Sequence, residues 1–210
     1  MNFDITAQTK KKSSGRNTCE YIVVHHTAWR WFHNQVEYLC NNPKKVSCHF
    51  VIWENGELAK IAEPRDITWH AWTSSREGKT NLNKYSLWIE VVSDGRFFTS
   101  EQMFALRKLI IHLMEIYDID ISNVIRHKDI TERKIDIGDN FWKHKFSSWN
   151  IFVTSVVESY TCTMSVIKRK IINYVINSNS SKYKKSNNKL EKEILKKINY
   201  WLREYLEFVK

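Results

Sequence analysis

The chain has 210 residues, enough for one ordinary domain and an appendage. Hydrophobic residues make up 42% of it and aromatic residues 13%, so a core can form and wholesale disorder is excluded. Only five Gly and two Pro are present, which excludes collagen-like and linker-like chains. The net charge of +10 favours an anionic partner or surface.

The charge is concentrated in the last third of the chain. Residues 151–210 carry 12 basic and 5 acidic side chains, whereas residues 1–150 carry 21 and 18. All eight His lie at or before His144. We therefore expect any catalytic residues to lie in the first part of the chain, whereas the second part carries most of the excess positive charge.

The cysteines and the amino-terminal segment predict a cytoplasmic, reduced protein. The four Cys show no paired spacing, and no apolar run follows the basic residues near the start, so we expect no signal peptide. No stretch approaches the roughly 18 apolar residues of a spanning helix.

The predicted elements begin after a polar, lysine-rich segment, residues 1–17, which we expect to be a flexible basic arm. The β-branched run at 19–28 predicts a buried strand. Residues 31–42 have helical spacing. Residues 49–63 predict two strands around an Asn55-Gly56 turn, a strong hairpin signal.

A second group of elements completes the expected domain. Residues 85–92 predict a strand, Ser100 is the expected N-cap of a long amphipathic helix, and residues 123–127 predict a further strand. Strands interspersed with helices favour an α/β or α+β fold, with a mixed central sheet flanked by helices, over residues 18–145.

The remainder, residues 146–210, is expected to be a mostly helical basic extension, with helices at 164–176 and 189–209. An apolar stripe on the last helix is compatible with packing against the parent domain. Such a stripe usually packs in this way; the alternative for the Lys-rich face is binding an anionic polymer or a membrane surface.

Three side chains form a candidate zinc site. His25 and His127 each stand where an apolar strand ends, and Asp136 follows in a polar loop. A catalytic zinc needs three such ligands and one open position for water. Taken alone each residue is a weak signal, because a His after a strand is more often a surface or hydrogen-bonded residue than a ligand, so the set by itself makes zinc hydrolysis only a candidate chemistry.

The order of motifs resembles the type 2 N-acetylmuramoyl-L-alanine amidases, a family that includes cytosolic anhydro-muropeptide amidases, phage lysozyme-amidases and peptidoglycan recognition proteins. The resemblance runs from about residue 20 to residue 142 and leaves the last third unexplained. The motifs that carry it are VVHHTA (23–28), VSCHFVIWENG (46–56), ITWHAW (67–72), NLNKYSLWIEVV (81–92), FTSEQMFAL (98–106) and VIRHKDITERKIDIGDNFW (124–142).

The resemblance implies a role for each matching residue. It makes His25, His127 and Asp136 the ligands of Zn²⁺, Glu90 the proton-transfer carboxylate and Lys134 the cation that stabilises the oxyanion. Glu90 also interrupts an apolar strand, where an unpaired buried charge would be unfavourable.

Three further residues are candidates for substrate binding. Trp69 and His70 match a family motif that lines the substrate cleft, although a Trp-His pair is as often simple packing. His26 is expected in the cleft or behind the ligands, because strand alternation points it away from His25.

Three departures from the family pattern bear on activity, and the first is Cys48, where a Tyr or Ala commonly precedes the family's His-Phe pair. Trp88 stands where the family has Gly, so that its indole either narrows the cleft or packs elsewhere. Both prolines of the family's loop after the last ligand are missing from Asp136-Ile137-Gly138-Asp139, which loosens that loop.

The resemblance implies a zinc-dependent N-acetylmuramoyl-L-alanine amidase that hydrolyses the bond between N-acetylmuramic acid and L-alanine in peptidoglycan or anhydro-muropeptides. The alternative is a non-catalytic muropeptide recognition protein, although such relatives typically lose a zinc ligand. Charge alone supports a nucleic-acid binder, and no nucleic-acid partner is expected. A recycling enzyme and an endolysin released to the wall both remain compatible with the sequence.

Overall fold

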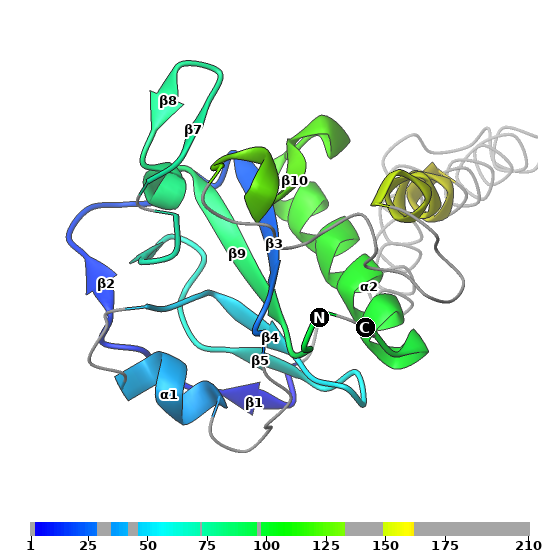
Figure 1. The fold of residues 1–210 in the computed structure, drawn as a ribbon, viewed down its shortest axis with the longest axis horizontal. Helices are drawn as coiled ribbons and strands as arrows, with labels where there is room; N and C mark the ends of the chain where they lie inside the picture. Colours follow the sequence, from blue (N-terminus) through cyan, green and yellow to red (C-terminus); the bar gives the residue numbers. More distant parts are fainter. Residues whose placement is uncertain are drawn as a thin grey trace, which may run out of the picture. The chain divides into compact units, whose positions relative to one another are not determined.

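A six-stranded mixed sheet forms the framework of the computed structural model, which describes residues 3–28, 35–41, 46–71, 73–95, 98–132 and 149–161 (Figure 1). The strand order is β1-β5-β4-β9-β3-β10. Along the chain these strands are β1 (Ile5–Thr6), β3 (Tyr21–His26), β4 (Phe50–Ile52), β5 (Leu58–Lys60), β9 (Ser86–Val91) and β10 (Val124–Arg126).

The central strands β4, β9, β3 and β10 are mutually parallel, and β4 and β5 form an antiparallel hairpin. The predicted Asn55-Gly56 turn closes that hairpin, where Gly56 adopts a φ of +83° that few residues other than glycine tolerate. The mixed sheet confirms the predicted fold class.

Two short antiparallel pairs lie outside the main sheet. They are β2 (Lys12–Ser13) with β6 (Ile67–Thr68), and β7 (Ser75–Arg76) with β8 (Lys79–Thr80). Single 3₁₀ turns occupy Leu82–Lys84, Ile121–Asn123 and His127–Asp129.

The first face of the sheet carries an apolar core shared with α1 (Gln35–Asn41). Because side chains alternate along a strand, Tyr21 and Val23 of β3 lie on this face with Trp88 of β9. They belong to one buried cluster that includes Leu39 and Cys40 of α1.

The long helix α2 (Ser100–Tyr117) crosses the sheet and contacts β4 (Figure 1). Its buried side chains recur at helical spacing: Met103, Leu106, Leu109, Ile110 and Leu113. Thr99, one residue before the expected N-cap, caps the helix, because its side chain accepts a hydrogen bond from the Gln102 backbone N–H.

The amino-terminal segment differs from the flexible arm that composition predicted. Within residues 3–17, β1 pairs with β5 and β2 pairs with β6. Strand pairing satisfies backbone donors and acceptors regardless of side-chain polarity, so a polar, lysine-rich sequence can add to a sheet.

The chain divides into two compact units, one of Asn2–Thr154 and one of Ser155–Lys210 together with Met1. Residues 149–161 are helical; they lie in the extension that was expected to be mostly helical, although no particular helix was predicted there. The expected helices at 164–176 and 189–209 lie outside the described residues. Within the described part of the chain, no helix has the length and apolar character needed to cross a membrane.

Candidate active site

Three parallel strands bring the predicted site residues to one edge of the sheet. His25 of β3 lies directly opposite Glu90 of β9 in the strand register. Arg126 of β10 is opposite Val24, so His127, the next residue, comes level with His25. Carboxyl ends of parallel strands meet at the same edge, where open α/β sheets bind their ligands.

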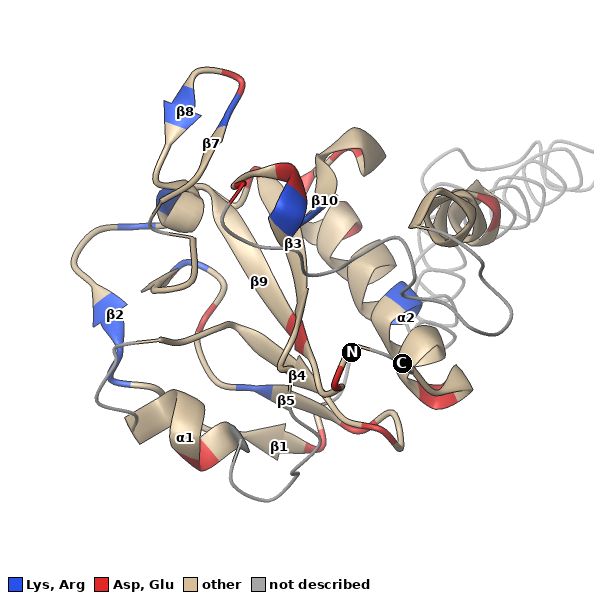
Figure 2. Ribbon diagram, viewed as in Figure 1, with Lys and Arg blue, Asp and Glu red and all other residues tan. Residues whose placement is uncertain are grey.

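His25 and His127 lie against each other at this edge. Their ring centroids are 3.9 Å apart, and the side chains are 2% and 5% exposed. Glu90 is also buried, at 8% exposed, and it is the only charged residue of β9 (Figure 2). Two adjacent imidazoles are ligands of the kind that zinc takes, and a catalytic site needs a third.

The other two predicted residues of the zinc site, Lys134 and Asp136, lie outside the described residues. Among the residues that the structure describes, no group of three or more His, Cys, Asp or Glu side chains is placed to hold a metal ion. The structure therefore brings together two of the three predicted ligands and the predicted base.

Trp88 occupies the middle of this cluster. Its ring stacks on His25 with centroids 3.2 Å apart and an interplanar angle of 8°. Its edge-to-face contact with His70 has a centroid separation of 4.0 Å. Its indole Nε1–H donates a 2.5 Å hydrogen bond to Oε2 of Glu90. Of the two positions that the sequence allowed for this indole, the structure selects the one inside the site.

His70 joins the cluster from the segment after β6. Its Nε2 lies 3.2 Å from the Ser86 hydroxyl, which itself donates to the Leu82 carbonyl oxygen at 2.7 Å. Nε2 therefore carries the proton, which leaves the Nδ1 lone pair as an acceptor. This buried Nδ1 has no hydrogen-bond partner among the described residues. Burial, followed by the neighbouring His49, holds the pKa of His70 well below its usual value.

His49 supports the strand that carries the site. Its Nδ1 accepts a 3.0 Å hydrogen bond from the Trp88 backbone N–H, and its Nε2 lies 3.0 Å from the Asp66 carbonyl oxygen. Burial lowers its pKa to about 4, so this imidazole is neutral at neutral pH. Cys48, beside it in the chain, has a pKa raised well above normal by burial and then by the Glu90 charge.

The other two substrate-binding candidates are placed differently. The His26 ring makes an edge contact with Phe98, and its Nδ1 accepts from the Ala28 backbone N–H at 3.1 Å. His26 thus points away from His25, as alternation predicted. Trp69, which precedes His70 in the chain, is half-buried, and its backbone is hydrogen-bonded to Ser47.

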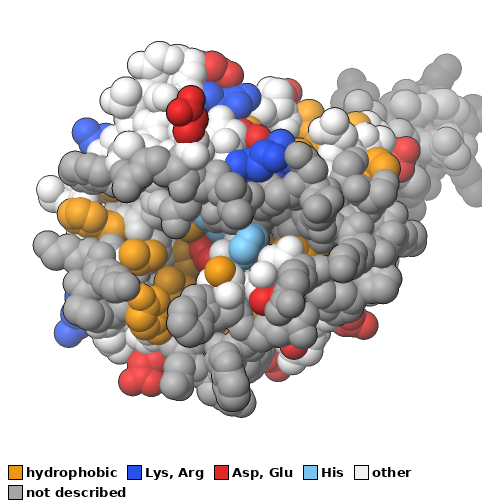
Figure 3. All heavy atoms as spheres, viewed as in Figure 1, with side chains coloured by type: hydrophobic (Ala, Val, Ile, Leu, Met, Phe, Trp, Pro, Cys, Tyr) orange, Lys and Arg blue, Asp and Glu red, His pale blue; other side chains and the backbone are white. Residues whose placement is uncertain are grey.

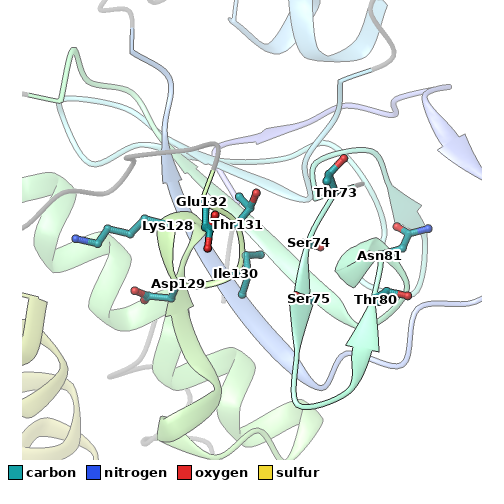
Figure 4. Close-up of a pocket in the computed structure, with 10 residues that line it drawn as sticks. All are labelled: Thr73, Ser74, Ser75, Thr80, Asn81, Lys128, Asp129, Ile130, Thr131 and Glu132. Atoms are coloured by element: carbon teal, nitrogen blue, oxygen red, sulfur yellow. The ribbon is translucent and has the colours of Figure 1, made fainter.

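An open pocket of about 790 Å³ lies between the β7–β8 hairpin and residues 128–132 (Figure 4). It begins at Lys128, the residue after His127. Thr73 and Asn81 stand on one side of it, and Thr131 and Glu132 stand on the other. Nine of its ten lining residues have hydroxyl, amide or charged side chains, which can bind the polar groups of a ligand. Figure 3 shows histidine side chains at the surface beside apolar ones near the centre of one face.

The sequence also matches a known protein family. Residues 15–139 match the model of the N-acetylmuramoyl-L-alanine amidase family. The chain belongs to this family.

Curated relatives of this amidase-family chain carry the name 1,6-anhydro-N-acetylmuramyl-L-alanine amidase AmpD. The protein from Haemophilus influenzae is 34% identical over 108 residues, which are 50% of this chain and 59% of the relative. The chain thus spans less than two thirds of that relative's length.

Solved structures share the fold, and one of them is of a named amidase. The structure of PlyL matches with a TM-score of 0.61 and 20% identity, covering 74% of this chain and 97% of PlyL. The Escherichia coli amidase AmiD, solved with the substrate anhydro-N-acetylmuramic acid-L-Ala-D-γ-Glu-L-Lys, matches with a TM-score of 0.54 and 27% identity. That match covers 62% of this chain and 56% of AmiD.

Proposed function

We propose that this chain is a zinc-dependent N-acetylmuramoyl-L-alanine amidase, which hydrolyses the amide bond between N-acetylmuramic acid and L-alanine. The observation that supports this most directly is the convergence of His25, Glu90 and His127 at the carboxyl edge of three parallel strands. Family membership and the names of the AmpD relatives support the same reaction.

The proposed metal ligands are His25, His127 and Asp136. The first two fit this role because they are buried and adjacent, and the third rests on the family pattern. A bound zinc ion lowers the pKa of a water ligand to about 7 and acts as a Lewis acid. An amide, a poor electrophile with a poor leaving group, requires both effects near neutral pH.

Glu90 is the proposed acid and base of the reaction. Its carboxylate accepts a proton from the attacking water and then donates that proton to the departing nitrogen of L-alanine. The products are the carboxylate of the muramic acid lactyl group and the free amine of the peptide. Lys134 stabilises the negative charge that develops on the carbonyl oxygen.

The substrate is proposed to be peptidoglycan or a muropeptide fragment of it. The polar pocket beside His127 lies where part of such a substrate, rich in hydroxyl and amide groups, can bind. A cytoplasmic location remains a prediction. Binding of anionic polymer or membrane by the basic extension also remains a prediction, because most of residues 146–210 lie outside the described part of the chain.

A digest tests the proposal. Purified peptidoglycan and a soluble anhydro-muropeptide are incubated with the protein, with and without a chelator, and the products are read by mass spectrometry. Release of free stem peptide that stops on chelation and returns with zinc is the expected result, and the preferred substrate separates a lysin from a recycling enzyme. A folded, zinc-loaded protein that cleaves neither substrate would instead favour the recognition protein.

A further inference from the structure

One aromatic side chain links the proposed base to a proposed metal ligand. Trp88 donates its indole Nε1–H to Oε2 of Glu90 at 2.5 Å and stacks its ring on His25. Both contacts come from the same side chain, which is 5% exposed. The two groups that it contacts lie on different strands, β9 and β3.

The backbone fixes where this indole can lie. Trp88 and Glu90 are two residues apart on β9, so their side chains emerge on the same face. The Trp88 N–H donates to Nδ1 of His49 at 3.0 Å, and its carbonyl accepts from the His49 N–H at 3.2 Å. The Trp88 backbone is therefore tied to His49 through both its N–H and its carbonyl oxygen.

We infer that Trp88 is a positioning residue, which holds the Glu90 carboxylate and the His25 ring in one fixed arrangement. For Glu90 this inference rests on the proposed function. A charge-assisted hydrogen bond restricts the rotation of a carboxylate that ends a flexible side chain. Stacking restricts rotation of the His25 imidazole, and it covers a face of that ring while the nitrogens remain at its edge.

Packing alone does not require both contacts. A buried indole needs an acceptor for its N–H, but any carbonyl oxygen would serve. Here the acceptor is the only carboxylate of β9. The glycine of the family pattern could make neither contact, so this chain positions its base and its ligand with a group of its own.

Two variants separate the contacts. Trp88→Phe keeps an aromatic ring against His25 and removes the N–H, whereas Trp88→Ala removes both. The matched control is Trp53→Phe, because Trp53 is 1% exposed in the same apolar cluster. For each protein, kcat, KM, zinc affinity by calorimetry and the unfolding temperature are measured.

We expect Trp88→Phe to lower kcat about 10- to 100-fold, the usual effect of losing a group that orients a reacting one, with KM and zinc affinity nearly unchanged. Trp88→Ala should also weaken zinc binding about tenfold or more. Trp53→Phe should change only the unfolding temperature. A kcat for Trp88→Phe equal to that of Trp53→Phe, or a zinc affinity for Trp88→Ala equal to that of the unchanged protein, would overturn the inference.

A spectroscopic test does not depend on turnover or on the folding of Trp88→Ala. Among the nine indole N–H signals of the ¹⁵N-tryptophan-labelled protein, the one absent from Trp88→Phe is that of Trp88. It should move in Glu90→Gln more than any other indole signal. An unmoved signal refutes the hydrogen bond even in a protein that proves to be an active amidase, whereas a moved signal in a protein that lacks amidase activity supports the contact and rejects only the proposed reaction.

Discussion

His25 and Glu90 stand directly opposite each other across the parallel ladder of β3 and β9. Both side chains are buried, at 2% and 8% exposed. Because they project from paired strands, backbone hydrogen bonds of the sheet set their separation. A site built on strands holds its groups more exactly than one built on loops.

Replacement of the proposed base should separate metal binding from turnover. Glu90→Gln keeps the shape of the side chain and removes its capacity to accept the water proton, so we expect zinc binding to persist and kcat to fall by at least 100-fold. Glu90→Ala should likewise retain zinc and lose most of its turnover. Calorimetry with zinc and an assay of stem-peptide release measure the two effects.

The matched control is Glu101→Gln, since Glu101 is exposed on the first turn of α2. It should leave kcat within about twofold of the unchanged protein, as surface substitutions usually do. Full activity of Glu90→Gln would remove Glu90 from the mechanism.

Removal of a proposed ligand should abolish metal binding and activity together. We expect His25→Ala and His127→Ala to lose stoichiometric zinc, and Asp136→Ala to do the same. Zinc should raise the unfolding temperature of the unchanged protein, since a ligand that binds the folded state stabilises it, but not that of these variants. His112→Ala, on α2, is the control that keeps its zinc. Stoichiometric zinc in a ligand variant would show that the ligand set is wrong.

Lys134 is expected to act on the transition state. If it stabilises only the developing oxyanion, Lys134→Ala lowers kcat and leaves KM almost unchanged. We expect a loss of about 100-fold or more. A rise in KM at constant kcat would instead mean that Lys134 binds the ground state of the substrate.

Stability should fall as the solution is acidified, through His49. Its pKa is about 4 in the folded chain, against an ordinary value of 6.5. Between these values the unfolded chain binds the proton more readily, so the free energy of unfolding is unaffected above pH 6.5 and decreases as pH falls towards 4. The decrease from this residue is on the order of 3 kcal/mol at most.

Urea unfolding at several pH values measures that decrease. His112, whose pKa burial also lowers to about 4, contributes in the same direction. His49→Gln should therefore flatten the pH dependence in part, and His112→Gln serves as the comparison. Parallel curves for His49→Gln and the unchanged protein would contradict the assignment.

Local patterns predicted the main elements. The strands expected at 19–28, 85–92 and 123–127 appear as β3, β9 and β10, because runs of β-branched and apolar residues suit a buried parallel sheet. The helix from residue 100 was predictable from its periodicity, although its cap is Thr99 and not the expected Ser100. The amino-terminal strands were not, since their partners β5 and β6 lie more than 50 residues away in the chain.

The sequence by itself determined the family, the mixed sheet and the identity of His25, Glu90 and His127 as candidates, because strand-end position and motif order are local properties. Only the tertiary structure decided that Trp88 contacts both His25 and Glu90, since alternation places the indole on the Glu90 face of its strand but does not say which strand pairs beside it. The register of β3 against β9 brings His25 level with Glu90, and the hydrogen bonds of His49 hold the Trp88 backbone in place. Contacts between strands so distant in the chain arise only when the sheet has formed.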